Sequence, residues 1–328
     1  MHMADALLSP AVGGGMYAAS AAAIAYSVTK FKKDDPGESK IPLMAVSGAM
    51  VFAAQMINFT IPGTGSSGHI GGGVLLAAML GPFAGLLALA AVLIIQCLFF
   101  ADGGLLALGC NIFNIAVIPC LFIYPLIFKR ILSPSPTAKR IWIASVVSVI
   151  IALQLGAFGV VAQTTASGVA LLPFPAFTLL MQPIHLAIGI VEGLVTAAIL
   201  SFVYAARPQI LTTAAFGQKG TFTGQKVIII TFVCIAVVTA VVLPLIASQN
   251  PDGLEWSILR LTGSTELEAS GGFLASLQER LSFMPDYDFA SGGGRGTPLA
   301  GVIGAVFVVG IALATGLIIT AARKRRQP

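Results

Sequence analysis

Residues 70–101 read IGGGVLLAAMLGPFAGLLALAAVLIIQCLFFA and contain no Asp, Glu, Lys, Arg or His. The stretch is longer than the roughly 20 residues that a membrane-crossing helix needs. Gly81-Pro82 interrupts it, and a proline cannot continue the hydrogen-bond ladder of a helix. The stretch therefore encodes either one kinked membrane span or two shorter helices that turn at this dipeptide.

The composition of the whole chain has the same character. Of 328 residues, 57% are hydrophobic and only 9% are Asp, Glu, Lys or Arg, whereas soluble domains carry about 25% charged residues. So few charges cannot cover a soluble surface, which excludes a soluble enzyme, a disordered chain and a nucleic-acid-binding protein. The net charge of +5 comes from short basic clusters between apolar runs, as is typical of the flanks of membrane spans. The sequence predicts an all-α polytopic protein of the lipid bilayer.

The basic clusters decide how many times the chain crosses the membrane. Two passes within 70–101 and an extracytoplasmic N-terminus leave 15 Lys and Arg inside and three outside. A single pass would move 11 of the 15 outside, against the positive-inside rule. We therefore expect about nine transmembrane helices and a cytoplasmic C-terminus, although 70–81 is short for a full crossing. The other apolar runs are 11–29, 41–60, 104–128, 141–163, 182–206, 227–247 and 298–322.

The expected passes fall into two parts. Residues 1–206 predict a seven-helix bundle, 207–226 a cytoplasmic linker, and 227–328 a hairpin of two spans around an extracytoplasmic loop, 248–297. This loop carries seven acidic residues against three arginines. It either concentrates cations near an entry or is a solvated surface that contacts the bundle. Its acidic residues are Asp252, Glu255, Glu266, Glu268, Glu279, Asp286 and Asp288.

No motif for ATP hydrolysis or proteolysis is present. The nearest approach to a phosphate-binding loop, GTFTGQK at 220–226, has the wrong spacing, and neither HExxH nor GxSxG occurs. We therefore expect no enzyme activity, and energy for any transport must come from a partner or a gradient.

The first two residues supply candidate metal ligands. An extracytoplasmic Met1-His2 offers a free α-amine, the His2 amide nitrogen and the His2 imidazole Nδ1. These close one five-membered and one six-membered chelate ring, so that three nitrogens lie nearly in a plane. A fourth nitrogen completes a square, which suits Ni(II) and Cu(II) rather than Zn(II) or Mg(II). We expect Met1 to be retained, since its excision needs a small second residue, and to be deformylated.

His69 is the candidate for the fourth nitrogen. It lies in the uncharged loop IPGTGSSGHIGGG, 61–73, on the same predicted side as Met1. Glycines there allow close backbone approach, although a histidine at this place can also simply cap the helix that follows. The amides Asn58 and Asn111 are candidates to hold His69 by hydrogen bonds that fix its tautomer.

His185 and Glu192 form a further candidate pair. Glu192 is the only carboxylate within the predicted spans, and a spacing of seven places it on the helix face of His185. Ionisable groups in a membrane are costly to bury and mark function by default. The two either satisfy one another inside the bundle or line a substrate pathway. The second case leaves a proton-coupled secondary metal transporter as an alternative.

Several stretches resemble the NikM/CbiM family in their order along the chain. They are Met1-His2, Asp5, Leu8-Ser9-Pro10, 52–114 and 184–200. Residues 250–255 (NPDGLE) and 285–289 (PDYDF), framed by two spans, resemble the NikN-type auxiliary subunit or PDGLE domain. Many NikM/CbiM relatives begin Met-His-Ile-Pro-Asp-Gly, whereas this chain begins Met-His-Met-Ala-Asp-Ala, so the turn after His2 lacks Pro and Gly.

The resemblance implies the substrate-binding (S) component of an energy-coupling factor importer in a prokaryotic plasma membrane. Metal would then be held by the Met1 amine, the His2 amide and imidazole, and His69. The implied partners are a transmembrane T component and two cytoplasmic ATPase subunits. Ni²⁺ is expected as transported substrate, not as a cofactor, with Co²⁺ as the alternative.

Overall fold

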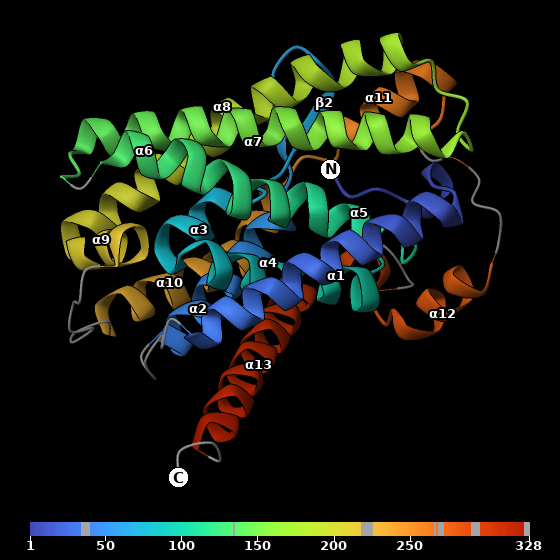
Figure 1. Ribbon diagram of the computed structural model, residues 1–328. Helices are drawn as coiled ribbons and strands as arrows, with labels where there is room; N and C mark the ends of the chain where they lie inside the picture. Colours follow the sequence, from blue (N-terminus) through green and yellow to red (C-terminus); the bar gives the residue numbers. More distant parts are fainter. Residues whose placement is uncertain are drawn as a thin grey trace.

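The computed structural model describes residues 1–33, 40–133, 135–217, 226–265, 267, 272–289 and 296–324. Long helices lie side by side in a bundle that α13 crosses obliquely (Figure 1). In chain order the elements are η1 (Asp5–Leu7), α1 (Pro10–Lys33), α2 (Lys40–Gln55), β1 (Phe59–Ile61), β2 (Ser66–Gly68), α3 (Gly73–Leu80), α4 (Pro82–Phe100), α5 (Leu108–Asn111), the π-helix η2 (Ile112–Phe128), α6 (Lys129–Leu132), α7 (Ala138–Ser167), α8 (Phe174–Ala206), α9 (Pro208–Phe216), α10 (Lys226–Val241), η3 (Leu243–Ile246), α11 (Gly253–Thr262), α12 (Phe273–Leu281), η4 (Pro285–Tyr287) and α13 (Thr297–Lys324).

The helices confirm the predicted class of an all-α polytopic membrane protein. Within the described residues, six helices are long and apolar enough to cross a membrane: Pro10–Lys32, Pro82–Phe100, Leu108–Leu132, Ala138–Ser167, Phe174–Ala206 and Thr297–Ala314. Two shorter apolar helices, Ile41–Gln55 and Val227–Val241, and the short helix α3 bring the number of described apolar helical segments to nine, the number that the sequence predicts.

The break in 70–101 lies at the Gly-Pro dipeptide, so the stretch forms two helices. Gly81 has φ 83° and ψ 164°, a conformation that side chains rarely allow. Pro82 begins α4, where its missing N–H would have had no helical partner. The eight residues of α3 rise only about 12 Å, and all are buried. The other helices therefore enclose α3, which is too short to cross the bilayer alone.

Three predicted runs, 41–60, 182–206 and 227–247, had a wrong boundary, and the last of them ends as an α-helix at Val241. The run 41–60 ends as a helix at Gln55, because the chain then turns into the antiparallel hairpin β1–β2, with Phe59 opposite Gly68 and Ile61 opposite Ser66. The run 182–206 begins eight residues earlier, at Phe174, because the helix continues through Pro183 instead of starting beside it.

The C-terminal hairpin shares one core with the bundle. Helices α10 and α13 pack against α2 and against each other. A Cβ at Gly304 would lie 1.9 Å from the ring of Phe52, so α13 and α2 are in close contact. The segment predicted as a linker contains α9, which packs on α3 and α8 and buries Ile210 and Leu211. Residues 218–225 of that segment lie outside the described residues.

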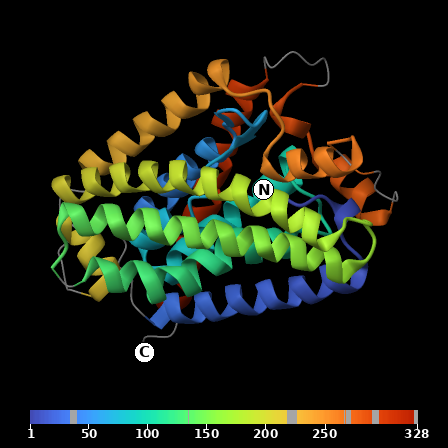
Figure 2. The same cartoon turned by 90° about the horizontal axis from the view of Figure 1, so that it is seen from above.

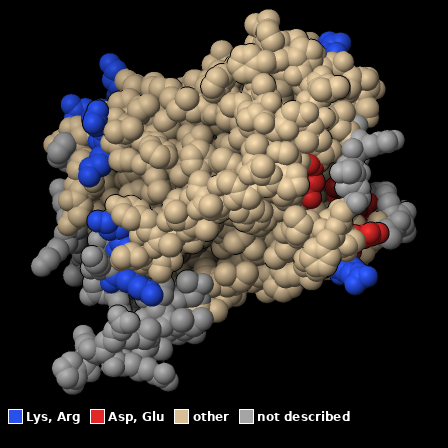
Figure 3. Space-filling model, turned by 45° about the vertical axis from the view of Figure 1, so that its right-hand side comes forward, with Lys and Arg blue, Asp and Glu red and all other residues tan. Residues whose placement is uncertain are grey.

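The surface is divided by charge. In Figure 3 most of the visible Lys and Arg gather at the left-hand end, whereas the visible Asp and Glu lie at the right-hand end together with some Lys and Arg, and uncharged residues lie between the two ends. Large apolar side chains of α7 and α8, such as Leu155, Leu179 and Leu186, are exposed. An uncharged belt with exposed apolar side chains is what a bilayer-embedded surface requires.

The contact between α1 and α5 depends on Gly109. A Cβ there would lie 2.5 Å from the Tyr17 nitrogen and 2.8 Å from the Met16 carbonyl carbon, and backbone atoms cannot move aside singly. We expect Gly109→Val to lower the free energy of unfolding by about 1–3 kcal/mol, measured as thermal unfolding in detergent. The control is Gly14→Ala on α1, where an added Cβ meets nothing within 4 Å. Equal melting of both variants would contradict this packing.

Candidate metal site

The first residues of the chain lie among the helices and not at the periphery of the molecule (Figures 1 and 2). The Met3 carbonyl accepts a hydrogen bond from the Gly104 amide at 2.9 Å, and the Met3 amide donates one to Asn111 Oδ1 at 2.8 Å. Asp5 Oδ1 accepts from the Ala107 amide at 3.1 Å. Met3 and Leu7 are fully buried. The turn η1 thus forms without the Pro and Gly of many relatives, and residues 1–8 are fixed against 102–111.

The loop that carries His69 is held from two sides. Glu192 of α8 accepts hydrogen bonds from the amides of Gly71 at 2.9 Å and Gly72 at 2.8 Å. Gln55 of α2 donates to the Gly71 carbonyl at 2.7 Å. Glu192 thus satisfies two N–H groups that precede α3, and Gln55 satisfies a carbonyl of the same loop, as backbone inside a protein requires.

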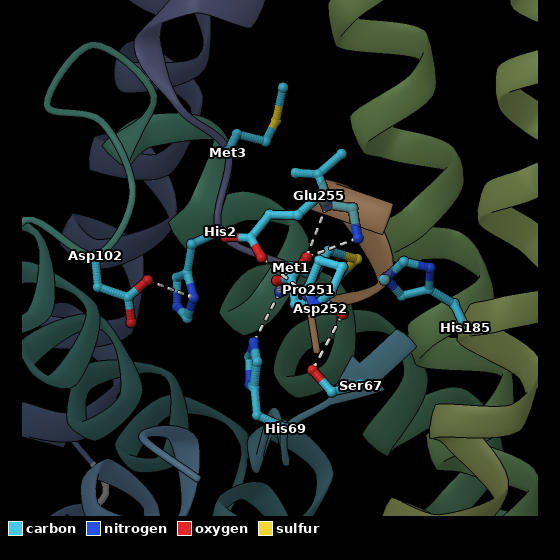
Figure 4. Close-up of polar contacts among 12 residues, drawn as sticks. Met1, His2, Met3, Ser67, His69, Asp102, His185, Pro251, Asp252 and Glu255 are labelled. Atoms are coloured by element: carbon cyan, nitrogen blue, oxygen red, sulfur yellow. Dashed lines mark hydrogen bonds and ion pairs between the residues drawn. The ribbon is translucent and has the colours of Figure 1, made fainter. Parts of the chain in front are cut away.

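The two segments meet at the amino group of Met1 (Figure 4). The Met1 amine lies 2.7 Å from His69 Nε2. The rings of His2 and His69 are stacked, with centroids 5.1 Å apart and planes inclined by 13°. The fold therefore brings the amine of Met1 and the imidazole of His2 next to the imidazole of His69, which lies 67 or more positions further along the chain.

His2 also contacts a carboxylate. Its Nδ1 lies 3.1 Å from Asp102 Oδ1, in the loop after α4, and Asp102 Oδ2 accepts from the Tyr287 hydroxyl at 2.5 Å. Burial would raise the pKa of Asp102, but His2 and the Tyr287 hydrogen bond hold this pKa below its usual value. To coordinate a metal, His2 Nδ1 must first exchange this partner.

A second carboxylate contacts the amine itself. Asp252 Oδ2 accepts from the Met1 amine at 2.7 Å, while Oδ1 accepts from the amides of Leu254 and Glu255 and so caps α11. Burial opposes ionisation, but the positive amine and His69 lower the pKa of Asp252 below its usual value. Burial and the Asp252 charge raise the pKa of Glu255 to about 7.

The His69 imidazole is neutral in this surrounding. Burial, the positive amine and His2 together lower the pKa of His69 to about 3. An uncharged Nε2 can accept a hydrogen bond from the amine or donate a lone pair to a metal. Within the described part of the chain, no three His, Cys, Asp or Glu side chains converge on one point. Metal binding here therefore requires nitrogens of the terminus and the backbone.

The two predicted amides have roles other than the expected one. Among the described residues, neither is a hydrogen-bond partner of His69, whose Nδ1 lies 3.4 Å from the Ile70 carbonyl. Asn111 bonds both backbone groups of Met3. Asn58 offers its main-chain carbonyl to the Ser248 amide at 2.8 Å. Both amides thus hold segments that surround the site.

The idea that His185 and Glu192 satisfy one another is wrong. His185 Nδ1 lies 2.8 Å from the Met181 carbonyl of its own helix, and Glu192 bonds the loop after His69. His185 Nε2 is buried and has no hydrogen-bond partner among the residues that the structure describes, and its ring faces the Met1 group (Figure 4). Both residues line a mainly apolar cavity beside Met1 and His69.

Sequence reasoning missed the two carboxylates at the site. Asp102 was not singled out, and its only signal was its place in 102-DGG-104 between two spans. Asp252 was counted only among the seven acidic residues of the outer loop. Two of those seven, Glu266 and Glu268, lie outside the described residues. Asp252-x-x-Glu255 does match a capping box, which the structure contains, but that motif predicts a helix start and no contact with Met1.

Comparisons with known proteins define the class. The chain matches the family model "Cobalt uptake substrate-specific transmembrane region" over residues 2–210 and the PDGLE domain over 226–321. Two solved structures, a transition metal transporter and a truncated transition metal transporter, superpose with TM-scores of 0.57 and 0.56 at 27% and 28% identity. They cover 67% and 63% of this chain and 100% and 99% of their own. The chain is thus a multi-pass metal-transport protein and not an enzyme.

Full-length relatives specify the family. A putative fused nickel transport protein NikMN of Archaeoglobus fulgidus is 32% identical, over 96% of this chain and 97% of its own. The fused nickel transport protein NikMN of Rhodobacter capsulatus is 28% identical, over 97% and 98%. The chain belongs to the CbiM/NikM family of nickel and cobalt transport components, fused to a NikN-like PDGLE domain.

Proposed function

We propose that this chain captures Ni²⁺ through the Met1 amine, the His2 amide and imidazole, and His69. The observation that carries the proposal is the 2.7 Å spacing between the Met1 amine and His69 Nε2. Metal–nitrogen bonds of about 2.0 Å at right angles place neighbouring nitrogens about 2.8 Å apart. The two ligands thus already lie at the spacing of adjacent corners of a planar site, and the neutral His69 needs no deprotonation.

A planar four-nitrogen site favours Ni²⁺ over tetrahedral Zn²⁺ and over oxygen-seeking Mg²⁺. Affinity at nitrogen sites also rises from Co²⁺ to Ni²⁺, and the full-length relatives in Archaeoglobus fulgidus and Rhodobacter capsulatus are named as nickel transport proteins. Co²⁺ is the second candidate, because the matching family model and a relative in Methanocorpusculum labreanum are named for cobalt.

The chain acts as the substrate-binding component of an energy-coupling factor importer in a prokaryotic plasma membrane. Its sequence contains no phosphate-binding loop, so ATP hydrolysis belongs to partners, a T component and two cytoplasmic ATPases. The excess of Lys and Arg at one end of the molecule supports an extracytoplasmic metal site and a cytoplasmic C-terminus. Residues 1–206 then form the metal-binding component, 207–226 the cytoplasmic linker, and 227–328 the fused hairpin with its outer loop 248–297.

The test is metal binding by the purified chain and three histidine variants. We expect one Ni²⁺ per chain in the parent, and a loss of affinity of more than about hundredfold in His2→Ala and His69→Ala, since even loss of a residue that merely orients a ligand costs about 10–100-fold. His185→Ala should keep one Ni²⁺ per chain, because His185 lines the cavity beside Met1 and His69 but is not one of the proposed ligands. The control is Glu279→Gln, at an exposed position of the outer loop, which should bind as the parent does. Full stoichiometric binding by both ligand variants would reject the site, and competition with Co²⁺ decides between the metals.

A further inference from the structure

The loop that follows α4 lies against the start of the chain. The Gly104 amide donates to the Met3 carbonyl at 2.9 Å. A Cβ at Gly103 would lie 3.2 Å from His2 Cβ, so the loop backbone passes directly beside His2. Residues 101–105, called here the DGG loop, thus form the surface that receives the N-terminal segment.

The fused domain holds the same loop through one side chain. Gln278 of α12 donates from Nε2 to the Cys97 carbonyl at 2.9 Å and to the Gly103 carbonyl at 2.8 Å. Its Oε1 accepts from the Leu105 amide at 3.3 Å. Both N–H groups and the oxygen of this one amide are therefore bonded to backbone groups, at three positions of the chain.

A single peptide group connects the two contacts. The carbonyl of Gly103 and the N–H of Gly104 belong to the same peptide unit, which is planar and trans, so its oxygen and its hydrogen point in opposite directions. Gln278 bonds the oxygen, and the Met3 carbonyl accepts from the N–H. A rotation of this unit would break both bonds, and the glycine on either side makes such a rotation easy in a free loop. Gln278 therefore fixes the plane that presents an N–H group to Met3.

The end of α4 provides the other anchor for the fused domain. The last four carbonyls of a helix have no helical N–H partner, and in α4 they include those of Cys97 and Phe99. Gln278 bonds the first of these carbonyls, and the amides of Phe283 and Met284 donate to the second at 3.2 and 3.3 Å. The fused domain thus caps α4, and Gln278 extends this cap to the DGG loop.

We infer that Gln278 is a positioning residue of the metal site: it fixes the DGG loop in the form that binds Met3, and Met3 holds Met1 and His2 where the metal binds. The inference rests on the proposed function. Each of these hydrogen bonds is made by groups other than the proposed ligand atoms, so metal binding breaks none of them. The segment that carries two ligand residues is therefore ordered before the metal arrives, and the cost of ordering it does not reduce the affinity.

Gln278→Met tests this positioning role, because methionine has nearly the length and shape of glutamine but no amide. Glu279→Met, at the adjacent exposed position of α12, is the matched control. Hydrogen exchange of the amides of residues 3–8 is measured in the metal-free full chain by mass spectrometry. Ni²⁺ affinity is measured by equilibrium titration, together with the absorption spectrum of the bound Ni²⁺.

We expect residues 3–8 to exchange about tenfold faster in Gln278→Met, because the hydrogen bonds that fix the DGG loop are lost. Ni²⁺ affinity should fall by about tenfold, as after loss of a residue that orients a ligand. The spectrum of bound Ni²⁺ should stay that of the parent, since the coordinating atoms are unchanged. Glu279→Met should match the parent in all three measurements.

Gly104→Ala acts on the same loop from the side of the N-terminal segment. A Cβ at Gly104 would overlap Asp5 Oδ1, so this variant displaces the segment while Gln278 can keep its bonds. If Gln278 acts through the DGG loop, adding Gln278→Met to Gly104→Ala should cause little further loss of Ni²⁺ affinity. Losses that multiply would overturn the proposal, because they would show two independent effects.

The remaining outcomes separate the positioning role from the metal site. Unchanged exchange of residues 3–8 and unchanged Ni²⁺ affinity in Gln278→Met, with binding still dependent on His2 and His69, would overturn the positioning role and leave the proposed function standing. Faster exchange in a chain whose Ni²⁺ binding does not depend on His2 and His69 would support the connection from Gln278 to the N-terminal segment and reject the proposed function.

Discussion

An extension of four residues, Gly-Ser-Gly-Ser, ahead of Met1 is expected to abolish high-affinity Ni²⁺ binding. The extension turns the Met1 nitrogen into an ordinary amide inside the protein, so that the terminal amine can no longer lie 2.7 Å from His69 Nε2. It also breaks the contact with Asp252. Since loss of a residue that only orients a ligand costs about 10–100-fold in affinity, loss of the ligand itself should cost more than about hundredfold.

The length of the extension matters. One added residue would create a new chelate of one amine, two amides and the His2 imidazole, which supplies four nitrogens without His69 and binds Ni²⁺ by itself. Four residues avoid this artefact. The matched control carries the same four residues after Pro328 and should bind as the parent does in equilibrium titration. Equal affinity of the two extended chains would show that the amine is not a ligand.

The helical framework was predictable because it depends on local signals. Apolar runs, the Gly81-Pro82 break and the distribution of basic clusters are each read within a few tens of residues. The predicted start of 182–206 was wrong because α8 begins at Phe174 and contains Pro183. The predicted end of 41–60 was wrong because the apolar run continues beyond the last helical residue, Gln55. The burial of the eight-residue α3 depends on neighbouring helices and was visible only as an unusually short run.

The candidate site was partly predictable for the same reason. Met1, His2 and His69 stand out because a chain with three histidines on 328 residues offers few other nitrogen ligands, and the structure brings these three together. Asp102 and Asp252 could not be placed, since they lie 100 positions from His2 and 251 positions from Met1, respectively. Their partners are set by packing between distant segments, which a single sequence does not encode in any local pattern.

Glu192→Ala is expected to weaken both the fold and the metal site. Glu192 is 2% exposed and accepts from the amides of Gly71 and Gly72, two and three positions after His69. The variant leaves two buried N–H groups without a partner, at about 1–3 kcal/mol each. We expect a loss of about 2–6 kcal/mol in unfolding free energy, measured by thermal unfolding in detergent. Ni²⁺ affinity should fall by about tenfold or more, because the loop that positions His69 is released.

Glu192→Gln separates this structural role from proton transfer. Its single side-chain oxygen can accept from one of the two loop amides while its NH2 group faces the other, so it should recover part of the stability and Ni²⁺ affinity that alanine loses. A proton-coupled secondary transporter instead requires a titrating carboxylate. In that case Glu192→Gln would bind Ni²⁺ better than Glu192→Ala and yet fail in uptake, in the same way as a chain treated with an uncoupler. Because Glu192 bonds the His69 loop and not His185, we expect uptake to follow the restored binding in Glu192→Gln, and equal defects in the two variants would refute the positioning role.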